Sequence, residues 1–141
     1  MRRILRFALL LAVPSAIAVG CSGGGDDDDD DAAANIDVTI GCAGPACGLT
    51  GALKVPLHEG TCASAPLLTL SVPAVTTSSN GEEAVALDGL VSGSTYCVEV
   101  WLDVDTSGTL SIGDAIASSG GQIVTPTGSA ELDFTLDALQ P

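Results

Sequence analysis

The sequence predicts an all-β fold, a Greek-key β-sandwich of about seven strands that is stapled by disulfides. Three observations lead to this prediction. Apolar and polar residues alternate in short segments with the period of two of half-buried strands, Gly, Pro and Ser stand between these segments, and no long segment has helical periodicity. Short strands at such close spacing are typical of two packed sheets.

The first 20 residues have the features of an export signal. Arg2, Arg3 and Arg6 give a basic start, and the apolar run 7–19 is shorter than the roughly 20 residues that span a bilayer. Small residues then precede Cys21, and the sequence Ala-Val-Gly-Cys resembles the lipobox of bacterial lipoproteins. This resemblance implies cleavage before Cys21 and acylation of that cysteine. The alternative is an ordinary secretory signal followed by an unmodified cysteine.

Residues 21–34 are predicted to be a tether between the lipid and a folded domain. Three glycines and six consecutive aspartates (26–31) offer no apolar surface to bury, and adjacent like charges extend a chain. In Gram-negative lipoproteins, a serine such as Ser22 after the acylated cysteine implies sorting to the outer membrane. We therefore expect an exported protein on the periplasmic face or the cell surface, attached through its N-terminal lipid.

Residues 35–141 have the length of one small domain, and we expect a single β-sandwich there. With Cys21 assigned to lipid, four of the five cysteines remain, which is an even number in an exported protein. Three pairings are possible. We favour Cys42 with Cys47, across a tight Gly-Pro loop, and Cys62 with Cys97; a four-cysteine zinc site is the alternative, but C-x-x-C pairs are lacking.

Seven segments are predicted to be strands: 36–40, 51–57, 67–72, 83–87, 95–103, 122–124 and 130–136. Pro56 is expected to mark a sheet edge or a strand end, and Pro73 to end the third strand. The residues that follow, 75–81, are expected to be a polar connector. The segment pattern is similar to prealbumin-like, fibronectin-like and other Ig-like modules of bacterial envelope proteins.

The strand 95–103 organises the domain. Its two faces carry Tyr96, Val98, Val100 and Leu102 on one side, and Cys97, Glu99, Trp101 and Asp103 on the other. Leu90, Gly93 and Tyr96 resemble the tyrosine corner of Greek-key sandwiches, in which the phenol bonds to upstream backbone where the chain crosses between sheets. The alternative is an ordinary glycine turn before a strand.

The loop that follows this strand resembles an EF-hand-type calcium loop. Positions 1, 3, 5, 7, 9 and 12 carry oxygen ligands, and Gly108 holds position 6; the ligands are Asp103, Asp105, Ser107, Thr109, Ser111 and Asp114. Ser107 is neutral and Asp114 is shorter than the usual Glu, so we expect weak calcium binding, at about 10⁻⁴ to 10⁻³ M. The alternative is a solvated acidic turn without an ion.

The charge of the chain limits its partners. All 18 acidic residues follow Cys21, against Lys54 alone among lysines and arginines. Such a surface repels nucleic acid and anionic lipid, so we expect no nucleic-acid partner. An envelope protein or a glycan is the expected kind of partner.

No catalytic constellation is visible, and we predict that the protein is not an enzyme. The sequence has no G-x-S-x-G motif, whose serine a histidine could activate. The one histidine, His58, is predicted to be a surface loop residue. Trp101 is predicted to lie in the core.

The favoured function is a lipid-anchored, calcium-stabilised envelope module with a structural or interaction role. A glycan- or peptide-binding module with Trp101 exposed is one alternative, and an enzyme with a pocket around His58 is another.

Overall fold

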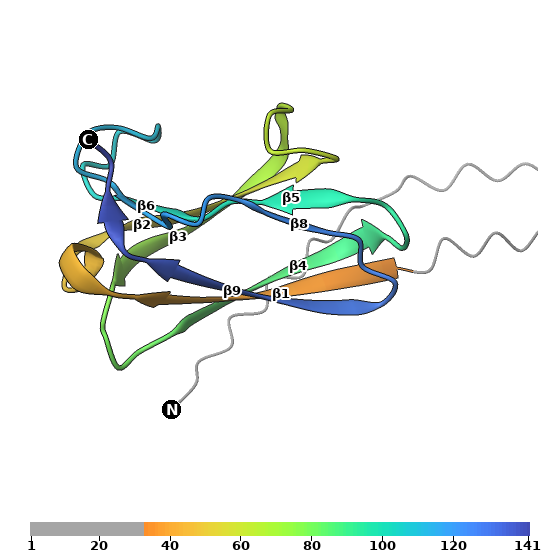
Figure 1. Cartoon of the computed structure of the whole chain (residues 1–141), viewed down its shortest axis with the longest axis horizontal. Helices are drawn as coiled ribbons and strands as arrows, with labels where there is room; N and C mark the ends of the chain where they lie inside the picture. The colour runs from red at the N-terminus through yellow and green to blue at the C-terminus, as the bar shows by residue number, and fades with distance from the viewer. Residues whose placement is uncertain (1–32) are drawn as a thin grey trace, which may run out of the picture.

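The computed structural model describes residues 33–141, which form two β-sheets packed face to face (Figure 1). The predicted signal peptide, the acylated Cys21 and nearly all of the predicted tether lie outside these residues. The described part has no α-helix, and therefore no helix that could cross a bilayer. The predicted all-β, disulfide-stapled sandwich is confirmed.

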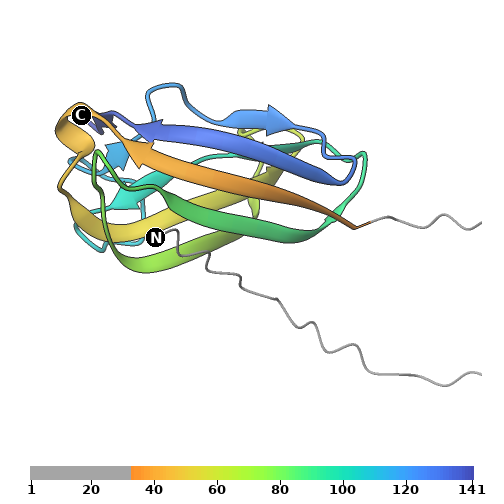
Figure 2. The same cartoon turned by 90° about the horizontal axis from the view of Figure 1, so that it is seen from below.

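The smaller sheet has three strands in the order β4-β1-β9. Figure 2 shows the three side by side in one layer; they are β1 (Ala33–Cys42), β4 (Glu83–Val91) and β9 (Ser129–Leu136). β1 is antiparallel to β4 and parallel to β9, so the first strand of the described chain and its last long strand are neighbours. This pairing joins the first strand and the last long strand of the described residues in one sheet.

The larger sheet is built around β2 (Thr50–Glu59). One side of β2 pairs with β3 (Pro66–Thr76), and the other side pairs with β5 (Tyr96–Val98) and then β6 (Trp101–Asp103). Three further short strands continue the sheet outward, with β8 beside β5 and the pair β7–β10 beside β6; they are β7 (Ala115–Ile116), β8 (Gln122–Val124) and β10 (Ala138–Leu139).

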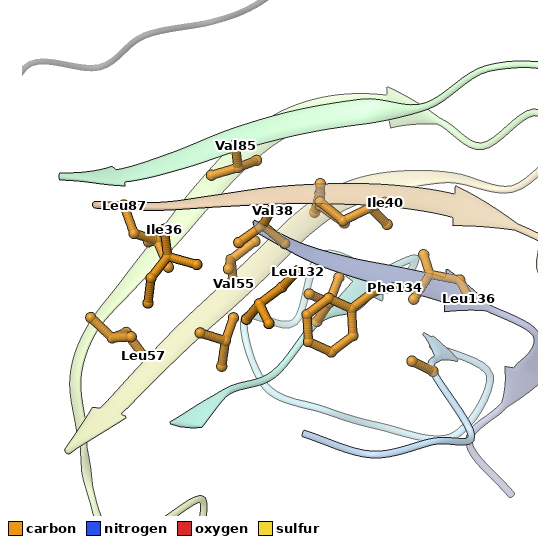
Figure 3. Close-up of a cluster of buried hydrophobic side chains, with 14 of the residues drawn as sticks. Ile36, Val38, Ile40, Val55, Leu57, Val85, Leu87, Leu132, Phe134 and Leu136 are labelled. Atoms are coloured by element: carbon orange, nitrogen blue, oxygen red, sulfur yellow. The ribbon is translucent and has the colours of Figure 1, made fainter. Parts of the chain in front are cut away.

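The core between the sheets is mainly aliphatic. Alternate residues of the long strands point inward and are buried, as Figure 3 shows; the labelled ones are Ile36, Val38, Ile40, Val55, Leu57, Val85, Leu87, Leu132, Phe134 and Leu136. This is the period-two pattern of a strand with one buried face. Phe134 and Tyr96 are the aromatic residues of this core.

Each of the seven predicted strands overlaps a strand of the structure, and β7 and β10 are additional two-residue strands. The single strand predicted at 95–103 is wrong in one respect, because it is divided into β5 and β6. Both parts pair with β2 in one unbroken register, and Pro56 falls opposite Glu99 at the break. The Glu99 N–H donates to the Pro56 carbonyl at 3.1 Å, but proline has no N–H to return the bond.

Pro56 was expected at a sheet edge or a strand end and Pro73 at a strand end, and both expectations are wrong. Pro56 lies inside β2, the central strand of its sheet, where only the one bond to Glu99 is lost. β3 continues through Pro73 to Thr76 by means of a bulge, at which Ala74 has a positive φ of 56°. The bulge extends β3 into the predicted connector.

The favoured disulfide pairing is present. Cys42–Cys47 closes a short loop that contains the 3₁₀ turn η1 (Gly44–Ala46), and Cys62–Cys97 ties the segment after β2 to β5. The Cα atoms are 5.3 and 5.2 Å apart, respectively. By loop-closure entropy, the longer loop contributes about 4 kcal/mol and the shorter one about 2 kcal/mol to stability.

The predicted bond of the tyrosine corner is also present. The Val91 N–H donates to the Tyr96 phenol oxygen at 3.0 Å, and Gly93 turns the chain with a φ of 78°. The turn carries the chain from β4 in one sheet to β5 in the other. The bond thus fixes the crossover between the sheets.

Candidate metal centre

Strand pairing brings the two ends of the acidic loop together. Asp103 is the last residue of β6, and Asp114 immediately precedes β7. β6 and β7 are antiparallel, with Leu102 opposite Ala115. One more step in the same register places Asp103 opposite Asp114, so two carboxylates eleven residues apart in sequence meet at the base of the loop.

Asp103 is almost completely buried, with 1% of its surface exposed. Its Oδ1 accepts the Ser107 N–H at 3.0 Å, and its Oδ2 accepts the Gly108 N–H at 2.9 Å. Gly108 has a φ of 81°, a conformation that glycine adopts without strain. Position 6 of the loop therefore turns the backbone back onto the carboxylate at position 1.

Asp114 is fully buried and holds both ends of the loop. Its Oδ1 accepts the Val104 N–H at 2.9 Å, and its Oδ2 accepts the N–H and the hydroxyl of Ser111 at 2.8 and 3.1 Å. The Asp114 carbonyl in turn accepts the Gln140 N–H at 2.8 Å, which connects the loop to the segment after β10.

Asp105 completes the cluster from the solvent side. Its Oδ1 accepts the Ser107 N–H at 2.9 Å and its Oδ2 accepts the Ser111 hydroxyl at 3.0 Å. Hydrogen bonding from Ser107, and then from Ser111, lowers the pKa of Asp105. One oxygen from each of Asp103, Asp105 and Asp114 lies within 4.8 Å of the others. The three aspartates therefore form a cluster that could hold a metal ion.

The charge of this cluster is incompletely balanced by the protein. Lys54 is the sole lysine or arginine between residues 33 and 141, and its Nζ lies 3.9 Å from Asp103 Oδ2. One positive charge faces three carboxylates, two of them buried, and buried charges are stable only when they are paired. Each carboxylate oxygen can accept more than one partner, so the backbone bonds leave lone pairs free for a cation. The residues fit a hard, oxygen-seeking ion.

The serine and threonine residues of the predicted ligand set lie in the same loop. The Ser111 hydroxyl lies 3.0 Å from Asp105 Oδ2 and 3.1 Å from Asp114 Oδ2, and a side-chain hydrogen bond from Ser107 is the first cause of the lowered pKa of Asp105. The Ser107 hydroxyl also lies 2.8 Å from the Thr109 carbonyl. Binding of an ion by these six residues stays a prediction.

His58 was predicted to be a surface loop residue, and this is wrong. It lies in β2 with 5% of its surface exposed; its Nδ1 is 2.7 Å from the Ser64 carbonyl and its Nε2 is 3.0 Å from Glu99 Oε2. A carbonyl can only accept, so Nδ1 carries the hydrogen. The segment 60–65 folds back over the sheet and covers the ring. The predicted Cys62–Cys97 disulfide could have indicated the contacts of His58, because it brings the segment 60–65 beside Glu99.

Trp101 was predicted to lie in the core, and this is also wrong. It is half-buried on the outer face of the larger sheet, opposite Lys54 of β2 and Ile116 of β7. Its neighbour Leu102 takes the inner position and is fully buried. Alternation determined which of the two residues faces outward, but it did not show that the outer face is only partly covered at Trp101.

A small cavity of about 60 Å³ lies between the sheets and does not involve His58. Its lining includes Ile40, Leu53, Val75, Glu83 and Leu136. Pockets for small organic ligands have volumes of about 300 to 1,000 Å³. This cavity has room for water rather than for a substrate.

No family model matches the chain, and no curated protein is significantly similar to it. The resemblances to lipoproteins, to EF-hand-type loops and to prealbumin-like modules therefore stay predictions.

Proposed function

We propose that the protein is a lipid-anchored module of the cell envelope, stabilised by calcium, with a structural or protein-interaction role. The leader and Cys21 support export and anchoring to the outer membrane. The two disulfides support an oxidising compartment, since such bonds persist outside the cytosol. We infer a resemblance of the fold to prealbumin-like and Ig-like sandwiches.

The observation that carries the calcium proposal is the pair of buried carboxylates, Asp103 and Asp114, with Asp105 beside them and one lysine nearby. All nearby donors are oxygens, which favours calcium or magnesium over zinc or copper. Calcium tolerates irregular geometry and the range of 6–8 ligands, whereas magnesium demands a near-ideal octahedron. A loop that offers carboxylates, hydroxyls and a carbonyl in irregular positions suits calcium better.

An ion bound there would tie β6 to β7 and, through Gln140, to the C-terminal segment. It would also neutralise the carboxylates that Lys54 leaves unbalanced. At the millimolar calcium of an exterior compartment, weak binding is sufficient for this stabilising role.

The arrangement of the chain supports a role in interaction. β1 enters the sandwich at Ala33, beside Val91 of the tyrosine corner, and the acidic loop lies at the opposite end (Figure 1). An anchor upstream of Ala33 would therefore attach at the end of the sandwich away from this loop. The loop also exposes Leu110 and Ile112, with 49% and 81% of their surfaces accessible. Exposed apolar side chains beside a cation site are suited to contact with another protein.

Binding of a glycan or peptide is the second candidate function. It is favoured by Trp101, whose ring is partly exposed on the outer face opposite Lys54. Aromatic rings with an accessible side are common in such sites. Titration with cell-wall glycans should then change tryptophan fluorescence, and the absence of any change would exclude a glycan at Trp101.

Thermal unfolding of the purified, exported protein tests the calcium proposal. With about 2 mM calcium, binding at the expected affinity adds about 0.6–1.8 kcal/mol to the free energy of unfolding, a rise of several degrees in Tm relative to chelator. Magnesium at the same concentration should give a smaller rise. A Tm that is the same in calcium and in chelator would show that calcium does not stabilise the fold.

Two matched variants test whether the calcium-dependent rise in Tm comes from the acidic loop. Asp105→Asn should abolish the calcium-dependent rise, because it removes the one exposed carboxylate of the cluster. Asp88→Asn removes an exposed carboxylate of β4 and should leave the rise unchanged. The anchoring proposal is tested separately by intact mass, which should show an acylated Cys21 at the N-terminus; an unmodified Cys21 would exclude the anchor.

A further inference from the structure

β3 has one edge without a partner strand among the described residues 33–141. In an antiparallel pair, successive residues direct their backbone groups alternately toward and away from the neighbouring strand. Pro56 directs its carbonyl toward Glu99, so its neighbours Val55 and Leu57 face β3 and pair with Leu70 and Leu68. The N–H and C=O groups of the alternate residues therefore point to the open edge; these residues are Leu67, Thr69 and Ser71.

The open edge of β3 lacks the usual charged protection. Edge strands are normally protected by charged side chains, which prevent pairing with another chain. The edge strands of the smaller sheet follow this rule, since β4 carries Glu83 and Asp88, and β9 carries Glu131 and Asp133. β3 is eleven residues long and carries no charge, and its prolines and its bulge lie at Pro66, Pro73 and Ala74, so the stretch 67–72 has none of the usual protection.

The side chains of β3 also leave apolar surface to cover. Leu68, Leu70 and Val72 pack against the core but are only half-buried, because no strand extends the sheet beyond them. A strand added to the open edge would bury more of these side chains. Thr69 lies at the middle of this exposed stretch.

We propose that β3 pairs with β3 of a second copy of this chain, antiparallel and about a two-fold axis at Thr69. In this register Thr69 lies opposite Thr69, and Leu67 opposite Ser71, so the outward backbone groups meet. On the inner side Leu68 lies opposite Leu70, which places apolar side chains together. Thr–Thr and apolar pairs across strands are stabilising.

The charge distribution leaves β3 as the strand at which a second copy can pair without facing carboxylates. Residues 33–141 carry twelve carboxylates and one lysine, so most surfaces of two copies would place like charges together, which is destabilising. β3 is the one strand longer than three residues that carries no charge, and its pairing brings no carboxylate opposite another. A two-fold pairing of this kind closes on itself as a dimer.

Sedimentation equilibrium of the purified, exported full chain in density-matched non-ionic detergent tests the proposal. We expect a monomer–dimer equilibrium that shifts to dimer as NaCl is raised, because salt screens the repulsion between two acidic molecules. Thr69→Lys places two lysines opposite each other and should weaken the dimer at least tenfold, although it lowers the net negative charge. Thr127→Lys makes the same change in an exposed loop and should retain the dimer.

A monomer at every protein and salt concentration would overturn the proposal. So would equal dimerisation of the two lysine variants, or loss of the dimer in both. Their melting temperatures are compared first. If Thr69→Lys melts at a lower temperature than Thr127→Lys, the dimerisation of Thr69→Pro is measured instead. This substitution removes an N–H that points to the open edge and not to β2.

Discussion

The Nζ of Lys54 lies 3.9 Å from Asp103 Oδ2 and donates to the Ser71 hydroxyl at 3.0 Å. Lys54 thus joins β3 to the acidic loop across β2. Between residues 33 and 141 it is also the one lysine or arginine that can offset the buried charge of Asp103 and Asp114. A lysine in this position stabilises the loop without an ion and opposes the binding of one.

Lys54→Met should therefore raise calcium affinity severalfold, because the nearest positive charge is removed from the cluster. In chelator the same variant should lose about 1 kcal/mol of stability, since the buried carboxylate of Asp103 loses its positively charged partner. Calorimetric titration and thermal unfolding measure the two effects. Lys54→Arg keeps the charge and serves as the control. A weaker calcium affinity in Lys54→Met would contradict the competition between lysine and ion.

Gly121 packs against the disulfide between Cys62 and Cys97. A Cβ at this position would lie 2.5 Å from Cys62 Sγ and 2.8 Å from Cys97 Sγ, and a cross-linked pair cannot move aside. Gly121→Ala should lower the free energy of unfolding by about 1–3 kcal/mol, as overpacking does. Gly41→Ala in β1 meets no atom within 4 Å and should be neutral or slightly stabilising. Denaturant unfolding compares the two, and equal stabilities would refute the close contact.

The sequence was sufficient to predict the strands, the disulfides and the meeting of the three aspartates. Strand alternation is a local property, and the even number of remaining cysteines limited the pairings to three. The spacing of the acidic loop was informative because Asp103 and Asp114 are brought together by pairing of the strands at its two ends. Each of these predictions needs only short-range information.

The surroundings of Pro56, His58 and Trp101 could not be predicted in the same way. Pro56 is tolerated in a central strand because its missing N–H affects one bond to Glu99, which depends on register. His58 and Trp101 lie on the same outer face of the larger sheet, but His58 is buried beside Ser64 and Glu99, whereas Trp101 is only half-buried. All three are consequences of tertiary arrangement.

Tyr96→Phe should destabilise the crossover between the sheets. The substitution keeps the buried ring but removes the oxygen that accepts the Val91 N–H, and a partly buried donor without a partner lowers stability by about 1–2 kcal/mol. Amide exchange at Val91 should also become faster. Thr95→Val removes an exposed hydroxyl one residue away, which bonds Thr125, and should have less than about 0.5 kcal/mol of effect. Equal stability of Tyr96→Phe and the native protein would show that the bond is not needed.

Asp137 should titrate below its ordinary pKa of 3.8, because the Ser118 hydroxyl and N–H both donate to its carboxylate, at 2.7 and 2.8 Å. These bonds hold β7 to the end of β9. A lowered pKa in the folded state means that the carboxylate contributes stability above pH 3.8, and that this contribution is lost as the pH falls through the folded-state pKa. NMR titration measures it directly. Ser118→Ala removes the hydroxyl and should raise the pKa of Asp137 part of the way to 3.8, whereas Ser119→Ala, at an exposed neighbour, should leave it unchanged. An Asp137 that titrates at or above 3.8 in the native protein would contradict the arrangement.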